Sequence, residues 1–129
     1  MNKIIYTFVI LFISQLNFAN GLDSILSKAR EFGKNKNYTE AIKAYESYIK
    51  NAGDINLKEV CIEIANCYFL VEKKELAVKY IKKAITKYGF TEDDFIYSNT
   101  LNEDLSKYAL SVIYDNYFDL RAQYLSTVK

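Results

Sequence analysis

Apolar residues recur every three or four positions along most of this chain, with polar residues between them. Within residues 54–90 they form two stripes, which the charged run Glu72-Lys73-Lys74 separates. The first stripe holds Leu57, Val60, Cys61, Ile64, Ala65, Tyr68 and Val71, and the second holds Leu76, Ala77, Tyr80, Ile81, Ala84, Ile85 and Tyr88. This spacing is that of an amphipathic α-helix with one buried face. It predicts two antiparallel helices joined by a tight turn, with Gly89 as the stop.

Residues 21–53 show the same pattern of two apolar stripes separated by a polar run. The two stripes here hold Leu22, Ile25, Leu26, Ala29 and Phe32, and then Ala41, Ile42, Tyr45, Tyr48, Ile49 and Ala52. The polar run 33–37 separates them, and Gly53 ends the second. Ala41 precedes Ala77 by 36 residues, as Phe32 precedes Tyr68. The chain therefore repeats a helix–turn–helix unit, which is typical of solenoid proteins.

Both units resemble tetratricopeptide (TPR) repeats, and the fragments NYTEAIKAYESYI and KKELAVKYIKKAI resemble the second helix of such a repeat. The matching small and large positions are Ala29, Phe32, Ala41 and Tyr45 in the first unit, and Ala65, Tyr68, Ala77, Ile81 and Ala84 in the second. Tyr48 departs from the pattern, which favours a small residue there, and Gly53 and Gly89 replace the usual proline. A generic antiparallel helical bundle would show the same stripes.

Residues 91–129 predict further helices that cap the second unit. Thr91 and the three acids after it form a helix start, residues 98–100 read as a loop, and Asn102 begins another helix. The expected apolar positions are Leu105, Tyr108 and Val112, followed by Tyr117, Leu120, Tyr124 and Val128. Asp115-Asn116 either breaks this helix or lies within it. The fragments AVKYIKKAITKYGF and EDLSKY resemble a pattern in exported bacterial repeat proteins.

Helix caps follow from the same residues. Asn56 is expected to cap the first helix of the second unit, with Glu59 reaching back to the cap amide.

The whole pattern predicts an all-α fold of two antiparallel helix–turn–helix repeats, residues 21–53 and 54–90, with C-terminal capping helices.

Residues 1–20 have the layout of a secretory signal peptide. Lys3 precedes an uncharged apolar run from Ile4 to Ile13, and Ala19 offers a small residue for cleavage. The run is shorter than the roughly 20 residues that a membrane span needs. We therefore expect an exported chain, periplasmic or secreted, without a membrane span in its mature part. The alternative is an uncleaved N-terminal anchor.

The composition argues against catalysis and against nucleic-acid binding. The chain has no histidine, which removes Ser-His-Asp and Cys-His catalysis and the commonest zinc ligand. Its four glycines are isolated, so no phosphate-binding loop exists. With 17 basic and 16 acidic residues it lacks the basic excess of a nucleic-acid footprint. We expect a non-enzymatic protein without a cofactor or metal, and we assign the acidic runs 92–94 and 115–119 to helix starts and solvated faces.

The two cysteines are not expected to form a disulfide with each other. Cys61 and Cys67 lie six residues apart on one predicted helix, which separates them by roughly 9 Å along its axis. A disulfide needs Cα atoms within about 7 Å. Core packing is the prediction for both, and a free thiol or an intermolecular link is the alternative for Cys67.

The TPR resemblance implies a function. In that family the first helices line a groove that holds a peptide. The matching positions here are Leu26, Arg30, Gly33, Glu59, Ile62, Asn66 and Phe69. Asn66 matches an asparagine that binds a peptide backbone in such grooves. Alternatively, Ile62 and Phe69 pack on the C-terminal helices. The predicted function is protein or peptide binding, and the alternative is a secreted assembly subunit that self-associates into a homo-oligomer.

Overall fold

The computed structural model describes residues 21–128; the predicted signal segment lies outside the described residues. The described part is all-α, without a strand. It contains a helical stretch over residues 21–34, then α2 (Tyr38–Asn51), α3 (Lys58–Leu70), α4 (Lys74–Tyr88), α5 (Glu92–Tyr97), α6 (Glu103–Ile113), the 3-10 turn η1 (Tyr114–Asn116) and α7 (Tyr117–Thr127). These bounds confirm the two helix–turn–helix units and the helices that follow them.

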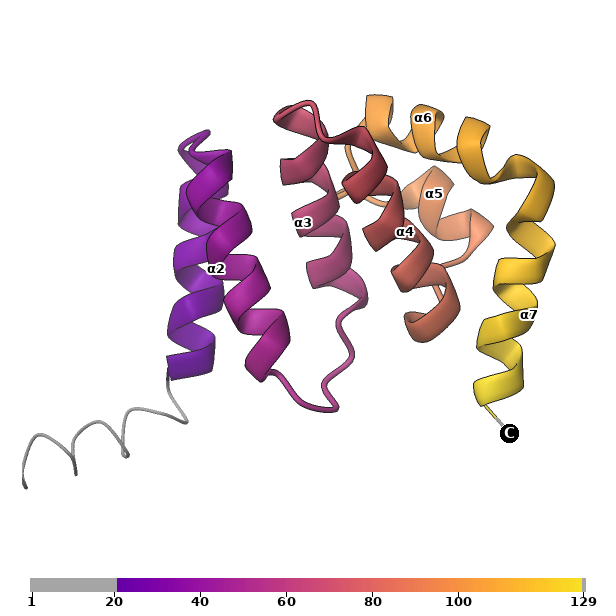
Figure 1. The fold of residues 1–129 in the computed structure, drawn as a ribbon, viewed down its shortest axis with the longest axis horizontal. Helices are drawn as coiled ribbons and strands as arrows, with labels where there is room; N and C mark the ends of the chain where they lie inside the picture. The colour runs from indigo at the N-terminus through magenta and orange to yellow at the C-terminus, as the bar shows by residue number, and fades with distance from the viewer. Residues whose placement is uncertain (1–20, 129) are drawn as a thin grey trace, which may run out of the picture.

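The helix over residues 21–34, α2, α3 and α4 stand side by side in chain order along the long axis of the molecule (Figure 1). The helix over residues 21–34 pairs with α2, α2 packs on α3, and α3 packs most extensively on α4. Then α6 crosses one end of this row, and α7 returns along the free side of α4. The C-terminal helices therefore close the end of the second unit, as the sequence predicts.

The backbone repeats with the same 36-residue period as the sequence. Lys36 and Glu72 adopt positive φ angles of 62° and 65° at the two interhelical turns. The next residue closes each turn in the same way: the Asn37 N–H donates to the Phe32 carbonyl at 2.8 Å, and the Lys73 N–H donates to the Tyr68 carbonyl at 2.9 Å. The two units are thus built alike at atomic detail, although their turn sequences differ.

Alanines at repeated positions let the helices approach closely. Four of them are completely buried, namely Ala29, Ala41, Ala65 and Ala77, and the second pair lies 36 residues after the first. Larger side chains fill the rest of the core, and Leu105 and Ile113 of α6 are fully buried with Ile64, Ile81 and Ile85. The C-terminal helices therefore share the core of the second unit.

Several local predictions are wrong, among them the apolar position Val128, which is 55% exposed. The N-cap of α3 is Leu57 and not Asn56, whose side chain accepts from the Lys58 N–H at 2.9 Å instead. Glu59 makes no capping-box bond; its carboxylate instead accepts a hydrogen bond from the Thr100 hydroxyl at 3.3 Å. In α6, Val112 is 48% exposed. The buried face of α6 consists of Leu105, Ala109 and Ile113, which are spaced i, i+4 and i+8. Ala109 is small, so this stripe is hard to recognise in the sequence.

The predicted starts of the last helices are correct. Thr91 and Asp94 form a reciprocal capping box at α5, and the Asn102 side chain accepts from the Leu105 N–H at 3.0 Å. Between α6 and α7, η1 marks the break at Asp115-Asn116 that the sequence left open.

Asp94 links this cap to the second unit, and its ionisation should contribute to stability. Its carboxylate accepts from the Thr91 N–H at 2.8 Å, from the Thr91 hydroxyl at 3.1 Å and from the Lys58 ammonium at 3.4 Å. Burial alone would raise the pKa of Asp94, but these hydrogen bonds and the Lys58 charge outweigh it and lower the pKa. The stabilisation is therefore present above the unfolded-state pKa and is lost as pH falls through the folded-state pKa.

We expect Asp94→Asn, which keeps an acceptor but removes the charge, to lower the melting temperature near pH 6. The difference from wild type should shrink as pH falls below about 4, where unfolded aspartate protonates. Thermal unfolding followed by circular dichroism across this range measures it. Asp93→Asn is the matched control, because Asp93 is an exposed acid on the same turn without a cap bond. A constant difference at every pH would contradict this role for Asp94.

Candidate functional site

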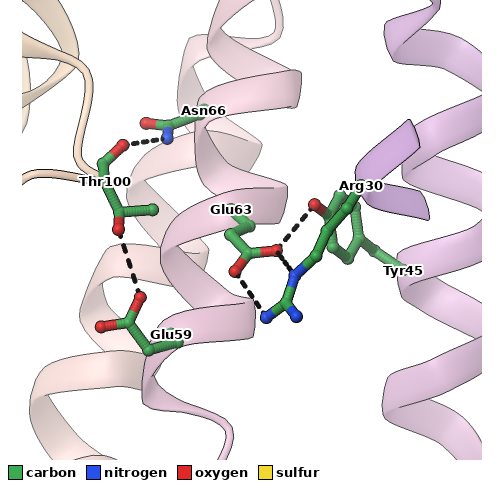
Figure 2. Close-up of polar contacts among 6 residues, drawn as sticks. All are labelled: Arg30, Tyr45, Glu59, Glu63, Asn66 and Thr100. Atoms are coloured by element: carbon green, nitrogen blue, oxygen red, sulfur yellow. Dashed lines mark hydrogen bonds and ion pairs between the residues drawn. The ribbon is translucent and has the colours of Figure 1, made fainter. Parts of the chain in front are cut away.

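A polar cluster joins the two units on the face that the first helices form. The Arg30 guanidinium donates two parallel hydrogen bonds to the Glu63 carboxylate, Nε to Oε2 at 3.0 Å and Nη2 to Oε1 at 2.9 Å. The Tyr45 hydroxyl donates to the same Oε2 at 2.7 Å, as Figure 2 shows. The three side chains come from three different helices, so Glu63 of α3 holds the first unit against the second.

The surroundings of Arg30 and Tyr45 raise the pKa of both side chains. The hydrogen bond to Glu63 and the charge of that carboxylate raise the pKa of Arg30, against the opposing effect of desolvation. Burial, followed by the Glu63 hydrogen bond, raises the pKa of the Tyr45 phenol far above its ordinary range. Tyr45 is therefore a neutral donor and Arg30 a fixed cation, so neither is suited to transfer protons near neutral pH.

A hollow of about 350 Å³ lies beside this cluster, at the ends of the helices that meet the interhelical turns. The side chains that give it its chemistry are Arg30, Lys34, Tyr38, Glu63, Asn66 and Leu70. Charged, hydroxyl and amide groups thus surround one leucine that is 43% exposed. Such a mixture suits a short peptide segment, which offers backbone polar groups and side chains together.

The rest of the predicted groove is occupied by the chain itself. The Asn66 amide donates to the Thr100 carbonyl at 2.7 Å, and its oxygen accepts from the Asn102 N–H at 2.9 Å. Glu59, about two helical turns before Asn66 on α3, accepts a hydrogen bond from the Thr100 hydroxyl (Figure 2). The Asn66 side chain therefore binds a peptide backbone, but it is the backbone of the loop between α5 and α6.

The apolar groove candidates pack inside the protein. Ile62 is only 2% exposed and borders the loop of residues 97–100, so it is not open to a ligand. Phe69 is half-buried, with its ring centroid 6.1 Å from that of Tyr108 in α6. Leu26 is half-buried at the edge of the core. Ile62 and Phe69 thus pack on the C-terminal segment, which is the alternative to a groove position that the sequence left open.

Of the predicted groove residues, the structure brings together Arg30, Gly33 and Asn66 around the hollow. Sequence reasoning missed four further residues that line it, namely Lys34, Tyr38, Glu63 and Leu70. One signal was present: Glu63 is the one acid within the otherwise apolar run from Val60 to Ala65.

Both cysteines are free and buried, which confirms that they do not pair with each other. Burial raises the pKa of the Cys61 thiol and of the Cys67 thiol to about 11. Cys67 borders the hollow, yet it stays protonated at neutral pH and is therefore a poor nucleophile.

Within residues 21–128, no group of three or more Cys, Asp or Glu side chains is arranged to hold a metal ion. None of the helices described is both long enough and apolar enough to cross a membrane. Comparisons with protein-family models, with curated proteins and with solved structures find no match to this chain.

Proposed function

We propose that this chain is a non-enzymatic module of TPR-like repeats that binds a protein or a peptide. The hollow between the helix over residues 21–34 and α3 is its binding site. The observation that carries the proposal is that some side chains lining the hollow, Lys34 and Leu70, are left open rather than used to stabilise the fold. Lys34 forms no ion pair with a described residue, and Leu70 stays largely open at the end of α3.

The repeat geometry supports the TPR-like assignment. The turn bonds and the buried alanines recur after 36 residues, which is close to the period of that family. The hollow lies where the first helices of the two units meet, on the side from which TPR proteins bind peptides. Export, as residues 1–20 predict, belongs to the same proposal.

A displayed peptide library, selected against the folded chain, tests the proposal. The dissociation constant of an enriched peptide would be measured by fluorescence anisotropy for wild type and for Leu70→Asp. We expect Leu70→Asp to weaken binding about tenfold or more, because it removes an apolar contact and places a carboxylate near Glu63. Ile55→Asp is the matched control, since Ile55 is 49% exposed in the α2–α3 loop, outside the hollow.

Equal affinities for wild type and both variants would place the peptide elsewhere and overturn this site. A selection that enriches no peptide would count against the function itself. Sedimentation of the free chain in the same buffer addresses the self-associating alternative, which the exposed rings of Tyr114 and Phe118 favour.

A further inference from the structure

The outward face of α4 carries four lysines within nine residues, Lys79, Lys82, Lys83 and Lys87. At 3.6 residues per turn they span about 140° of the helix circumference and about 12 Å of its length. The opposite face of α4 is buried in the core. We call these four residues the lysine row.

No carboxylate of residues 21–128 forms an ion pair with the lysine row. None of its ammonium groups lies within 4.0 Å of an acidic side chain in the described part of the chain, and residues 1–20 contain no acid. Instead, two of its ammonium groups lie over tyrosine rings. The Lys83 ammonium lies 5.9 Å from the Tyr80 ring centroid, and the Lys87 ammonium lies 5.5 Å from that of Tyr88.

The first unit shows that the fold does not require these charges. The positions 36 residues earlier, on α2, hold Lys43, Glu46, Ser47 and Asn51. Only one of the four is a lysine, and its ammonium pairs with Glu40 at 3.3 Å. The first helix–turn–helix unit thus forms without such a row. Four like charges without an acidic partner on one face repel one another, which is a cost to the folded state.

The chemistry of the lysine row fits a surface rather than a pocket. A single carboxylate or phosphate is best held by the planar fork of arginine, whereas lysine is a mobile point charge. The row contains no arginine and does not border the hollow of the proposed peptide site. Clustered lysines attract anionic lipid headgroups, and tyrosine rings suit the headgroup region. We propose that α4 docks lengthwise on an anionic lipid bilayer through the lysine row.

Vesicle flotation tests this surface directly. The purified chain lacking residues 1–20 would be mixed with vesicles of phosphatidylcholine, with or without phosphatidylglycerol. We expect binding only to the vesicles with phosphatidylglycerol, weakening as salt is raised. The triple variant Lys82→Gln, Lys83→Gln and Lys87→Gln should bind on the order of 100-fold more weakly, since each lysine contributes roughly a factor of five.

The matched control removes the same net charge elsewhere, with Lys28→Gln, Lys36→Gln and Lys107→Gln, all exposed positions outside α4. Circular dichroism would establish that both triple variants are folded. We expect this control to bind nearly as well as wild type, and an equal loss in both variants would overturn the proposal. So would displacement by inorganic phosphate at constant ionic strength, which would mean that free phosphate is the ligand. Salt-sensitive self-association without vesicle binding would likewise overturn it, in favour of an acidic protein surface.

Discussion

Replacing Gly89 with alanine is expected to lower the free energy of unfolding by about 2–5 kcal/mol. Gly89 ends α4 with a φ of 74°, which costs an L-residue about 1–2 kcal/mol. A Cβ added there would lie 2.6 Å from Cζ of Tyr124, so the ring must move, at a typical overpacking cost of about 1–3 kcal/mol. Thermal unfolding should show a melting temperature lower by about 10 °C or more.

Gly53 provides the matched control at the corresponding end of the first unit. Its φ is 65°, yet nothing lies within 4 Å of an added Cβ. Gly53→Ala should therefore show the backbone cost alone. In a background of Tyr124→Ala, the effect of Gly89→Ala should fall to the same value. Equal effects of the two glycine substitutions in wild type would show that the Tyr124 contact does not matter.

The contact explains how α7 closes the row of helices. Glycine at residue 89 ends α4, and its bare Cα also lets the Tyr124 ring approach the helix end. Tyr124 in turn lies beneath the Arg121 guanidinium, 5.4 Å from the ring centroid. One small residue thus serves both the local turn and the packing of the last helix.

The sequence predicts what depends on near neighbours along the chain. The apolar stripes, the glycine stops and the Thr91 and Asn102 caps all act within a few residues, so helices and turns can be read from the sequence. The repeat adds a second copy as a check, because Ala41 and Ala77 occupy corresponding positions and are both completely buried. That is why the all-α fold and its two units were predictable.

The candidate site depends on partners that lie far apart in sequence. Arg30 and Glu63 are 33 residues apart, and Asn66 and Thr100 are 34 residues apart. Each side chain had several possible partners, and only the packing of whole helices selects one. The same reason accounts for the misplaced cap, since Glu59 binds Thr100 across the loop instead of its own helix start. Polar recognition was therefore less predictable than the core.

The depth of Ile62 separates the observed site from the groove that the sequence predicts. At 2% exposure, Ile62→Asp would place an unpaired carboxylate in the core. We expect a loss of about 4 kcal/mol or more, which combines the lost apolar burial with the cost of the charge. That is a large share of the roughly 5–15 kcal/mol that stabilises a typical domain, so we expect the urea midpoint at neutral pH to fall sharply. Leu70→Asp, at an open position, should remain close to wild type.

The pH dependence of the stability of Ile62→Asp shows whether the buried charge causes the destabilisation. Burial would raise the pKa of the new carboxyl above its unfolded value, so destabilisation is greatest above the folded-state pKa. As pH falls through that pKa the carboxyl protonates, and part of the lost stability returns relative to Ile62→Asn, which cannot ionise. Urea unfolding at neutral and mildly acidic pH measures this difference. If Ile62→Asp were as stable as Leu70→Asp, residue 62 would be open to solvent, and a groove running the length of α3 would again be the better site for a peptide.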